Sequence, residues 1–275
     1  MNLRLPDDEL LTNGINHLKK TRYGLILFNP NDLYIGKSFD LYGEYSEGEI
    51  TLFRQLIKPG AVVLDIGANI GSHSLFFAQS VGPGGILMAF EPQRILFQML
   101  CANMALNGVI NSYCYNTAVG SSSGTLIVPT LDYGAENNFG GLSLNADYSG
   151  QGEQTGILAI DNLKLPQCHF IKIDVEGMEL EVLKGAEETI NRCRPLLYVE
   201  NDRKENSPRL IEYLQSMGFN LFWHCPKLFN ADNYFSNTMN IFANLVSVNM
   251  LCFPSELTLD IEGLPPVKGV DDWCI

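Results

Sequence analysis

Short apolar runs that stop at a carboxylate recur along the chain, and they predict the strands of a central sheet. The first of them, residues 61–64, contains no polar residue, which is typical of a strand buried on both faces. The clearest runs, each with the acid that follows it, are 61–64 before Asp65, 85–90 before Glu91, 170–173 before Asp174 and 195–199 before Glu200. Further strands are expected at residues 111–115, 155–159, 219–224 and 240–248.

Helical periodicity occupies the intervals between these runs. Apolar positions recur at helical spacing in residues 72–78, and Pro92 opens a second helical segment that ends at Asn107-Gly108. Two more helices are expected at residues 178–184 and 210–217, each before a glycine. Strands that alternate with helices in this way favour a doubly wound, mainly parallel sheet.

The two ends of the chain are expected to stand apart from this sheet. Residues 1–20 predict an irregular or helical lead-in, and residues 22–28 and 32–36 flank a turn signal and predict a β-hairpin. A helix follows over residues 50–57, and Ser46 and Glu49 before it are spaced as a capping box. We expect a cover segment at residues 1–45, a main domain at 46–250 and an extended tail at 251–275.

Residues 120–154 differ from the rest of the main domain because glycine, serine and asparagine are frequent and strand-like pieces are short. A loop of this length inside a compact domain is usually functional. We treat it as a lid-like insertion, in which residues 137–141 form a substrate lid with glycine hinges or, equally, a flexible surface hairpin.

Composition places the chain among globular proteins that act on something other than nucleic acid. Its 275 residues are 46% hydrophobic and 18% charged, which allows a sizeable core. The formal net charge of −13 disfavours nucleic acid as a partner, since such binding depends on lysine and arginine contacts to phosphate. The seven cysteines show no C-x-x-C spacing, which favours a reducing compartment over zinc or disulfides.

The N-terminal residues lack the basic and then apolar order of a signal peptide, and the sequence contains no long apolar run. We therefore expect a cytoplasmic protein that does not insert in a membrane.

A glycine turn follows the strand at 61–64 and is the strongest chemical signal in the sequence. The pattern is Asp65-x-Gly67-x-x-x-Gly71, and a second acid, Glu91, ends the next strand. Such a turn lets a ligand approach the backbone closely. The dinucleotide fingerprint G-x-G-x-x-G has a third glycine that is missing here, so a nicotinamide site is disfavoured.

Three separated segments, LDIGANIGSHS, AFEP and IKIDVEGMELEVLKGA, stand in an order that resembles the FkbM family of S-adenosylmethionine (AdoMet) methyltransferases. The resemblance runs from about residue 42 to about residue 248. It implies the class I methyltransferase fold, which is a Rossmann-like sheet of seven strands, here with an N-terminal hairpin as cover. The implied activity is methyl transfer to oxygen on small molecules such as sugars, polyketides and other natural products.

The resemblance also implies how AdoMet is held. The glycine turn would pack against the methionine part, Glu91 would accept both ribose hydroxyls, and residues 116–119 would receive the adenine. The acids before the helix at 50–57 would lie over the cofactor, or they simply favour a helix N-terminus. The complete set of implied contacts is Tyr45, Glu47, Asp65, Gly67, Ala68, Asn69, Gly71, Ser74, Glu91, Pro92, Asn116, Ala118 and Asp174.

Candidate catalytic groups lie at the carboxyl ends of the later strands, where ligands bind in open α/β sheets. Asp174 is the preferred acceptor-side carboxylate, followed by Glu176, whose charge would also suit a helix N-terminus. His224 ends a strand near the same edge and is either a proton acceptor or a packed histidine, and the same choice holds for His73.

Asp174 and the pair Glu200-Asn201 resemble the ligand set of metal-dependent catechol O-methyltransferases. Oxygen ligands of this kind suit Mg²⁺ or Ca²⁺, which would acidify a bound hydroxyl. A base that works without metal is the alternative.

Three functions remain open. The favoured one is O-methylation of a small-molecule acceptor, and the alternatives are N-methylation and a scaffold that binds AdoMet without catalysis. The acidic composition demotes an RNA acceptor. The sequence predicts neither the acceptor nor the oligomeric state.

Overall fold

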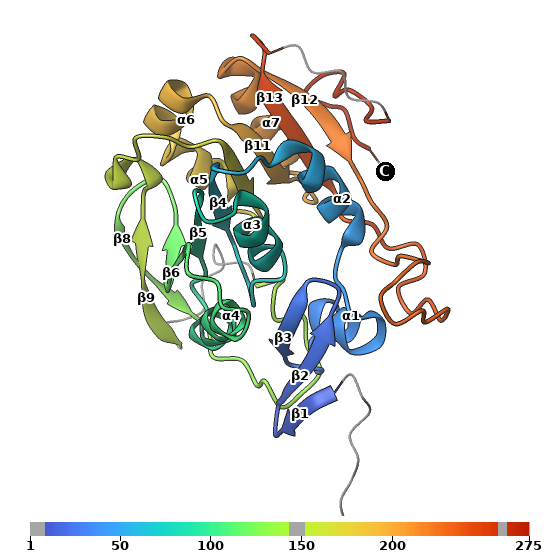
Figure 1. Cartoon of the computed structure of the whole chain (residues 1–275). Helices are drawn as coiled ribbons and strands as arrows, with labels where there is room; N and C mark the ends of the chain where they lie inside the picture. Colours follow the sequence, from blue (N-terminus) through green and yellow to red (C-terminus); the bar gives the residue numbers. More distant parts are fainter. Residues whose placement is uncertain (1–8, 143–151, 258–262, 275) are drawn as a thin grey trace, which may run out of the picture.

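The computed structural model describes residues 9–142, 152–257 and 263–274, and its centre is a sheet of seven strands (Figure 1). The strand order is β12-β13-β11-β10-β4-β5-β6, and β13 runs antiparallel to both of its neighbours while the other pairs are parallel. This confirms the expected mainly parallel sheet. The strands are β4 (Val62–Ile66), β5 (Ile86–Phe90), β6 (Ser112–Tyr115), β10 (Phe170–Ile173), β11 (Leu196–Glu200), β12 (Phe219–His224) and β13 (Asn249–Pro254).

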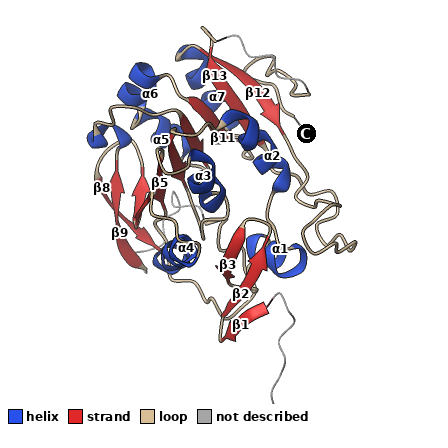
Figure 2. Ribbon diagram, in the orientation of Figure 1, coloured by secondary structure: helices blue, strands red, loops and turns tan. Residues whose placement is uncertain are grey.

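Helices cover both faces of the sheet, because successive strand residues point to opposite sides (Figure 2). Val63 belongs to a core that includes side chains of three helices, α2 (Glu47–Leu56), α3 (Ser74–Val81) and α4 (Arg94–Leu106). Leu64, the next residue, belongs to a second core with α5 (Glu179–Lys184), α6 (Glu187–Cys193) and α7 (Ser207–Ser216). The sheet is therefore doubly wound, as the sequence predicts.

The N-terminal part forms a small antiparallel sheet of β1 (Glu9–Asn13), β2 (Asn16–Thr21) and β3 (Gly24–Phe28), followed by α1 (Ile35–Tyr42). The outer edge of β3 is paired by two side chains of α4 instead of a strand. Asn103 Oδ1 accepts the Leu27 N–H at 2.6 Å and its Nδ2 donates to the Leu27 carbonyl, and Asn107 does the same for Leu25. This sheet is thereby fixed to the main core.

Three sequence expectations for this part are wrong. Residues 9–21 form strands and not a lead-in, and β3 pairs with β2 and not with residues 32–36. Asp32 explains the second difference, since its carboxylate accepts the N–H groups of Tyr34 and Gly36 and turns the chain into α1. The capping box is also absent, because Ser46 has a left-handed backbone (φ 49°) and makes no side-chain cap bond.

A second small sheet with the order β7-β9-β8 spans the expected insertion, but only β8 lies wholly within residues 120–154. Its strands are β7 (Thr117–Val119), β8 (Gly124–Val128) and β9 (Glu153–Leu158), and a 3₁₀ turn over Ile160–Leu163 follows. The strand expected at 155–159 thus lies outside the central sheet. Residues 143–151 of the insertion lie outside the described part of the chain.

The last strand of the sheet is displaced from its expected position. Residues 240–248 form a loop, and the strand is β13 at Asn249–Pro254, where six successive residues are buried. Asn240 ends any extended run, because its side chain accepts the Phe242 N–H and donates to the Ala243 carbonyl, and Ala243 has φ 50°. The first residues of the expected tail therefore lie inside the sheet.

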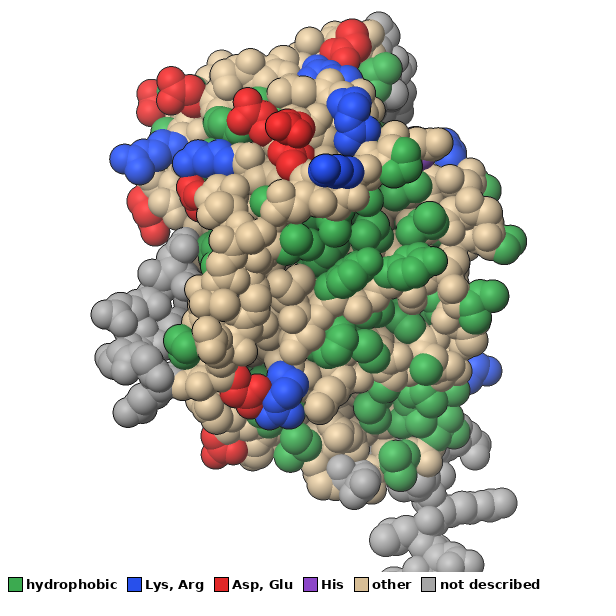
Figure 3. All heavy atoms as spheres, turned by 90° about the vertical axis from the view of Figure 1, so that its left-hand side faces the viewer, with side chains coloured by type: hydrophobic (Ala, Val, Ile, Leu, Met, Phe, Trp, Pro, Cys, Tyr) green, Lys and Arg blue, Asp and Glu red, His purple; other side chains and the backbone are tan. Residues whose placement is uncertain are grey.

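The surface is unevenly charged. On the face shown in Figure 3, hydrophobic side chains spread across the middle, whereas acidic and basic ones gather mainly towards the top. The basic groups seen on this face form no continuous band of the kind that attracts a nucleic acid backbone. No helix in the described ranges has the length and apolar character needed to cross a bilayer.

Candidate active site

A cavity of about 330 Å³ opens at the carboxyl ends of the parallel strands, where open α/β sheets bind ligands. Its wall includes the last residues of β4, β5 and β11 and the residues that follow β4, β5 and β10. The predicted site residues that line it are Tyr45, Gly67, Ala68, Asn69, Glu91, Pro92, Ala118, Asp174, Glu176 and Glu200.

The glycine turn is shaped by the strand end beside it. Gly67 has φ +80°, and a Cβ built at this position would lie 1.7 Å from the carbonyl oxygen of Asp174. Glycine is therefore required for two reasons, the left-handed backbone and the close approach. The N–H groups of Gly67 and Ala68 both donate to the Phe90 carbonyl at 3.0 Å, which ties the turn to β5.

Asp65 supports the turn from behind the cavity wall. Its side chain is 1% exposed, and the Ser74 hydroxyl donates to its Oδ2 at 2.5 Å. Asp65, Gly71 and Ser74 were expected to contact the cofactor, and all three lie in the described part of the chain, but none of them lines the cavity. A Cβ at Gly71 would meet Leu100 of α4 at 2.8 Å, so this glycine serves the packing of the turn.

Glu91 presents a buried carboxylate to the cavity. It accepts the N–H of Asn69 at 2.9 Å and that of Gln93 at 2.8 Å, and it is 4% exposed. Burial raises the pKa of Glu91 to about 7, although the two backbone bonds oppose the shift. Asn116 does not line the cavity, but its amide donates to the carbonyls of Glu91 and Pro92 and fixes this corner.

Glu49 and His73 lie side by side in the wall and both are buried, with Glu49 Oε2 3.0 Å from His73 Nε2. The Asn249 amide also donates to Glu49, at 2.9 Å. Burial alone would raise the pKa of Glu49, but the hydrogen bond and charge of His73 outweigh it and lower that pKa. His73 lines the cavity, and its side chain makes no cap hydrogen bond although it stands at the N-cap of α3.

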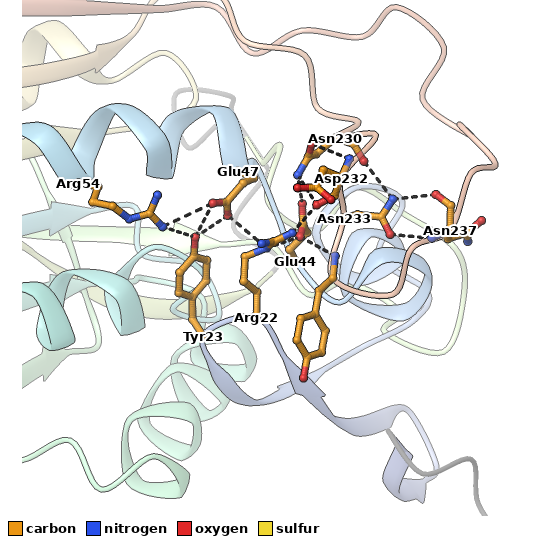
Figure 4. Close-up of polar contacts among 10 residues, drawn as sticks. Arg22, Tyr23, Glu44, Glu47, Arg54, Asn230, Asp232, Asn233 and Asn237 are labelled. Atoms are coloured by element: carbon orange, nitrogen blue, oxygen red, sulfur yellow. Dashed lines mark hydrogen bonds and ion pairs between the residues drawn. The ribbon is translucent and has the colours of Figure 1, made fainter.

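Glu47 points elsewhere. The Tyr23 hydroxyl donates to its carboxylate at 2.6 Å, Arg54 approaches it at 3.5 Å, and the side chain is not part of the cavity wall (Figure 4). His224 is also outside the wall, because Nδ1 of its ring lies 2.8 Å from the Tyr198 hydroxyl. Burial lowers the pKa of His224.

Lys172 is a cavity residue that the sequence reasoning missed. It is 3% exposed and lies between Asp174, at 2.9 Å, and Asp65, at 3.8 Å. Burial would lower the pKa of Lys172, but the two carboxylates raise it above its usual value. The available signal was a single lysine in the otherwise apolar strand Phe170–Ile173.

Three carboxylates converge in the wall of the cavity, at the ends of β10 and β11. One oxygen from each of Asp174, Glu176 and Glu200 lies within 4.8 Å of the others. Burial, followed by the charge of Asp174, raises the pKa of Glu176 to about 7 and that of Glu200 well above its usual range. Asn201 does not join them, since its amide donates to Ser207 Oγ at 2.9 Å and is buried.

The expected lid residues also reach the cavity. Asn138, Gly140 and Gly141 line it, while Phe139 between them is fully buried. The Gln93 amide donates to the Phe139 carbonyl at 2.8 Å and fixes this segment beside Glu91.

Comparison with known proteins agrees with this geometry. The model of the methyltransferase FkbM domain matches residues 65–221. Methyltransferase sdnD of Sordaria araneosa is 28% identical over 165 residues, which are 46% of this chain and 60% of that protein. Hexuronic acid methyltransferase AglP of Haloferax volcanii is 28% identical over 160 residues, which are 53% of this chain and 57% of that protein. The chain thus spans less than two thirds of either relative.

Among solved structures, methyltransferase FkbM from Methylobacillus flagellatus matches with a TM-score of 0.48 and 17% identity, over 74% of this chain and 50% of that one. The domain match includes the glycine turn, Glu91 and the carboxylate cluster. The chain belongs to the FkbM family of methyltransferases.

Proposed function

We propose that the protein transfers a methyl group from AdoMet to a hydroxyl of a small molecule such as a sugar. The observation that carries this proposal is the meeting, in one cavity, of the glycine turn, the buried Glu91 and an acceptor-side group of carboxylates. AglP, a relative named as a hexuronic acid methyltransferase, supports a sugar as acceptor.

The residues at the carboxyl ends of β4 and β5 would hold the methyl donor. Glu91 would accept the ribose hydroxyls, and residues 67–69, which line the cavity, would contact the methionine part. Ala118 and its neighbours would take the adenine. The donor supplies an electrophilic methyl group on a sulfonium.

A residue on the acceptor side of the cavity would remove the proton of the acceptor hydroxyl. We assign this role to Asp174, because it lines the cavity and Lys172 holds its carboxylate at 2.9 Å. Asp174 would accept the proton of the acceptor hydroxyl as its oxygen takes the methyl group that bound AdoMet would supply, with S-adenosylhomocysteine as the leaving group. Alignment of the two reactants supplies up to roughly 7–11 kcal/mol of the barrier. Glu176 is the second candidate, and His224 is set back behind Tyr198.

A divalent cation is the alternative way to acidify the hydroxyl. The ligands would be Asp174, Glu176 and Glu200, with Asn201 no longer among them. Oxygen ligands of this kind suit Mg²⁺ or Ca²⁺. Activity that falls on chelation and returns with Mg²⁺ supports this mechanism, and indifference to the chelator removes it.

The test combines binding with turnover. Calorimetry should detect AdoMet binding, and incubation with methyl-labelled AdoMet and a host extract should label one small molecule, whose analysis identifies the methylated atom. Asp174→Asn should lower turnover by about 100-fold while AdoMet binds within about threefold of wild type. AdoMet binding without any labelled product would favour the scaffold, absence of AdoMet binding would overturn the proposed donor site, and a label on nitrogen would favour N-methylation.

A further inference from the structure

A long loop at residues 226–247 forms one wall of the cavity. Its two ends pair with each other, because the Leu228 N–H donates to the Leu245 carbonyl and the Ser247 N–H donates to the Pro226 carbonyl, both at 3.0 Å. Leu228 and residues 245–247 line the cavity from this paired base. The wall is largely apolar, and it stands in the same cavity as the carboxylates of the acceptor side.

The far end of this loop is fastened to one buried carboxylate, Glu44 (Figure 4). Asn230 donates to Glu44 Oε1 at 2.8 Å, and the Tyr234 N–H donates to Oε2 at 2.8 Å. Arg22 donates to Oε2 at 2.6 Å and also to the Asp232 carbonyl at 2.5 Å. Glu44 is 3% exposed, so both of its oxygens are removed from water and committed to these partners.

The residues before Glu44 fasten the rest of the loop. The Tyr42 hydroxyl donates to the Met239 carbonyl at 2.8 Å and accepts the Ile241 N–H at 3.0 Å. A Cβ at Gly43 would lie 2.8 Å from the Tyr234 ring, so only glycine lets the loop lie this close. Tyr42 also packs with Leu228 and Phe242, which joins the base of the loop to the same short segment.

We infer that Glu44 is a positioning residue that fastens the 226–247 loop as the acceptor-side wall of the cavity. The inference rests on the proposed function, because an acceptor-side wall requires an acceptor. Glu47 provides the comparison. It lies three residues further along and accepts a hydrogen bond from Tyr23. It also pairs with Arg54 at 3.5 Å and more distantly with Arg22 at 3.8 Å, and none of these three partners is a loop residue. The geometry thus separates fastening of the loop from fastening of α2.

Amide hydrogen exchange on the full chain tests the fastening without any acceptor. Glu44→Gln keeps only one accepting oxygen, so exchange in residues 228–247 should speed up by about tenfold or more, as expected for loss of bonds to a charged group. Exchange in β4 and α3 should not change. Asn230→Ala removes one bond to Glu44 and also the two bonds between the Asn230 side chain and the Asp232 backbone, so it should speed up exchange in the same residues. Glu47→Gln should give little or no change there.

The second readout separates acceptor from donor. Once labelling has identified the acceptor, Glu44→Gln should raise the KM for that acceptor about tenfold, while the Kd for AdoMet stays within about twofold of the wild-type value. Unchanged loop exchange in both Glu44→Gln and Asn230→Ala overturns the inference, and so does a parallel loss of AdoMet affinity. If Glu44→Gln does not fold, Asn230→Ala decides. If wild type transfers no methyl group, the proposed function fails, while the exchange data still decide the fastening.

Discussion

Burial and backbone hydrogen bonds act in opposite directions on the protonation of Glu91. Its carboxylate is 4% exposed, which favours the neutral form and raises its pKa to about 7, with the Asp65 and Asp174 carboxylates as smaller causes. The backbone N–H groups of Asn69 and Gln93 point at the same carboxylate and favour the ionised form. Ribose hydroxyls would add two donors and tip the balance towards the ionised form.

The affinity for AdoMet should therefore depend on pH through Glu91. Below about pH 7 the protonated carboxyl must release its proton on binding, so affinity should rise with pH, by up to about tenfold per unit, and level off above pH 7. Calorimetry between pH 5.5 and 8.5 in two buffers measures both the affinity and the released proton. Glu91→Gln should bind more weakly and lose this dependence, while Glu47→Gln should keep it. A Glu91→Gln profile parallel to wild type would contradict this role.

At the scale of elements, the turn between β4 and α3 is defined by contact as well as by backbone angle. Gly67 and Gly60 share a positive φ, +80° and +84°, but an added Cβ at Gly60 meets nothing within 4 Å. The pair therefore separates backbone strain from the close approach of Asp174 to the turn.

Gly67→Ala should lower the free energy of unfolding by about 3 kcal/mol and AdoMet affinity by at least about tenfold, because the methyl group would displace the Asp174 carbonyl. Gly60→Ala should cost about 1 kcal/mol and leave AdoMet affinity unchanged. Urea unfolding and calorimetry measure both effects. Equal losses in the two variants would show that the angle alone matters.

The strands and the turn could be predicted because buried parallel strands and glycine turns leave local patterns. The role of Lys172 could not, since it depends on the pairing of β10 with β4, which places Lys172 opposite Asp65. The displaced strand has a similar cause, because residues 240–248 and 249–254 are both apolar and the Asn240 turn decides between them. Asn201 likewise follows Glu200 in sequence, but the strand end turns its amide away from the carboxylates.

At the scale of the whole molecule, the N-terminal sheet and the main domain share one core. Ile26 and Phe28 of β3 are 2% and 0% exposed and belong to the core that contains Val63. Asn103 joins the two parts directly, because its fully buried amide bonds Leu27 of β3 and donates to the Ile70 carbonyl in the glycine turn at 2.7 Å. We propose that residues 1–45 form a cover that folds together with the main domain.

Asn103→Ala should lower the free energy of unfolding by about 3 kcal/mol in a single transition, because three backbone groups lose their buried partner. As a control, Asn220→Ala at an exposed position of β12 should change the free energy of unfolding by less than about 0.5 kcal/mol. Urea unfolding followed by fluorescence and circular dichroism provides the measurement. Two separate transitions would instead identify the N-terminal sheet as an independent unit.

The stretch shared with the family ends at residue 221, five residues before the loop that Glu44 fastens begins. The matched stretch holds the glycine turn, Glu91 and the carboxylate cluster, while the loop that lines the same cavity lies beyond it. If the loop is the acceptor-side wall, as we infer, a change confined to residues 226–247 would alter the product and leave the cofactor site intact. Membership of the family would then not by itself identify the acceptor.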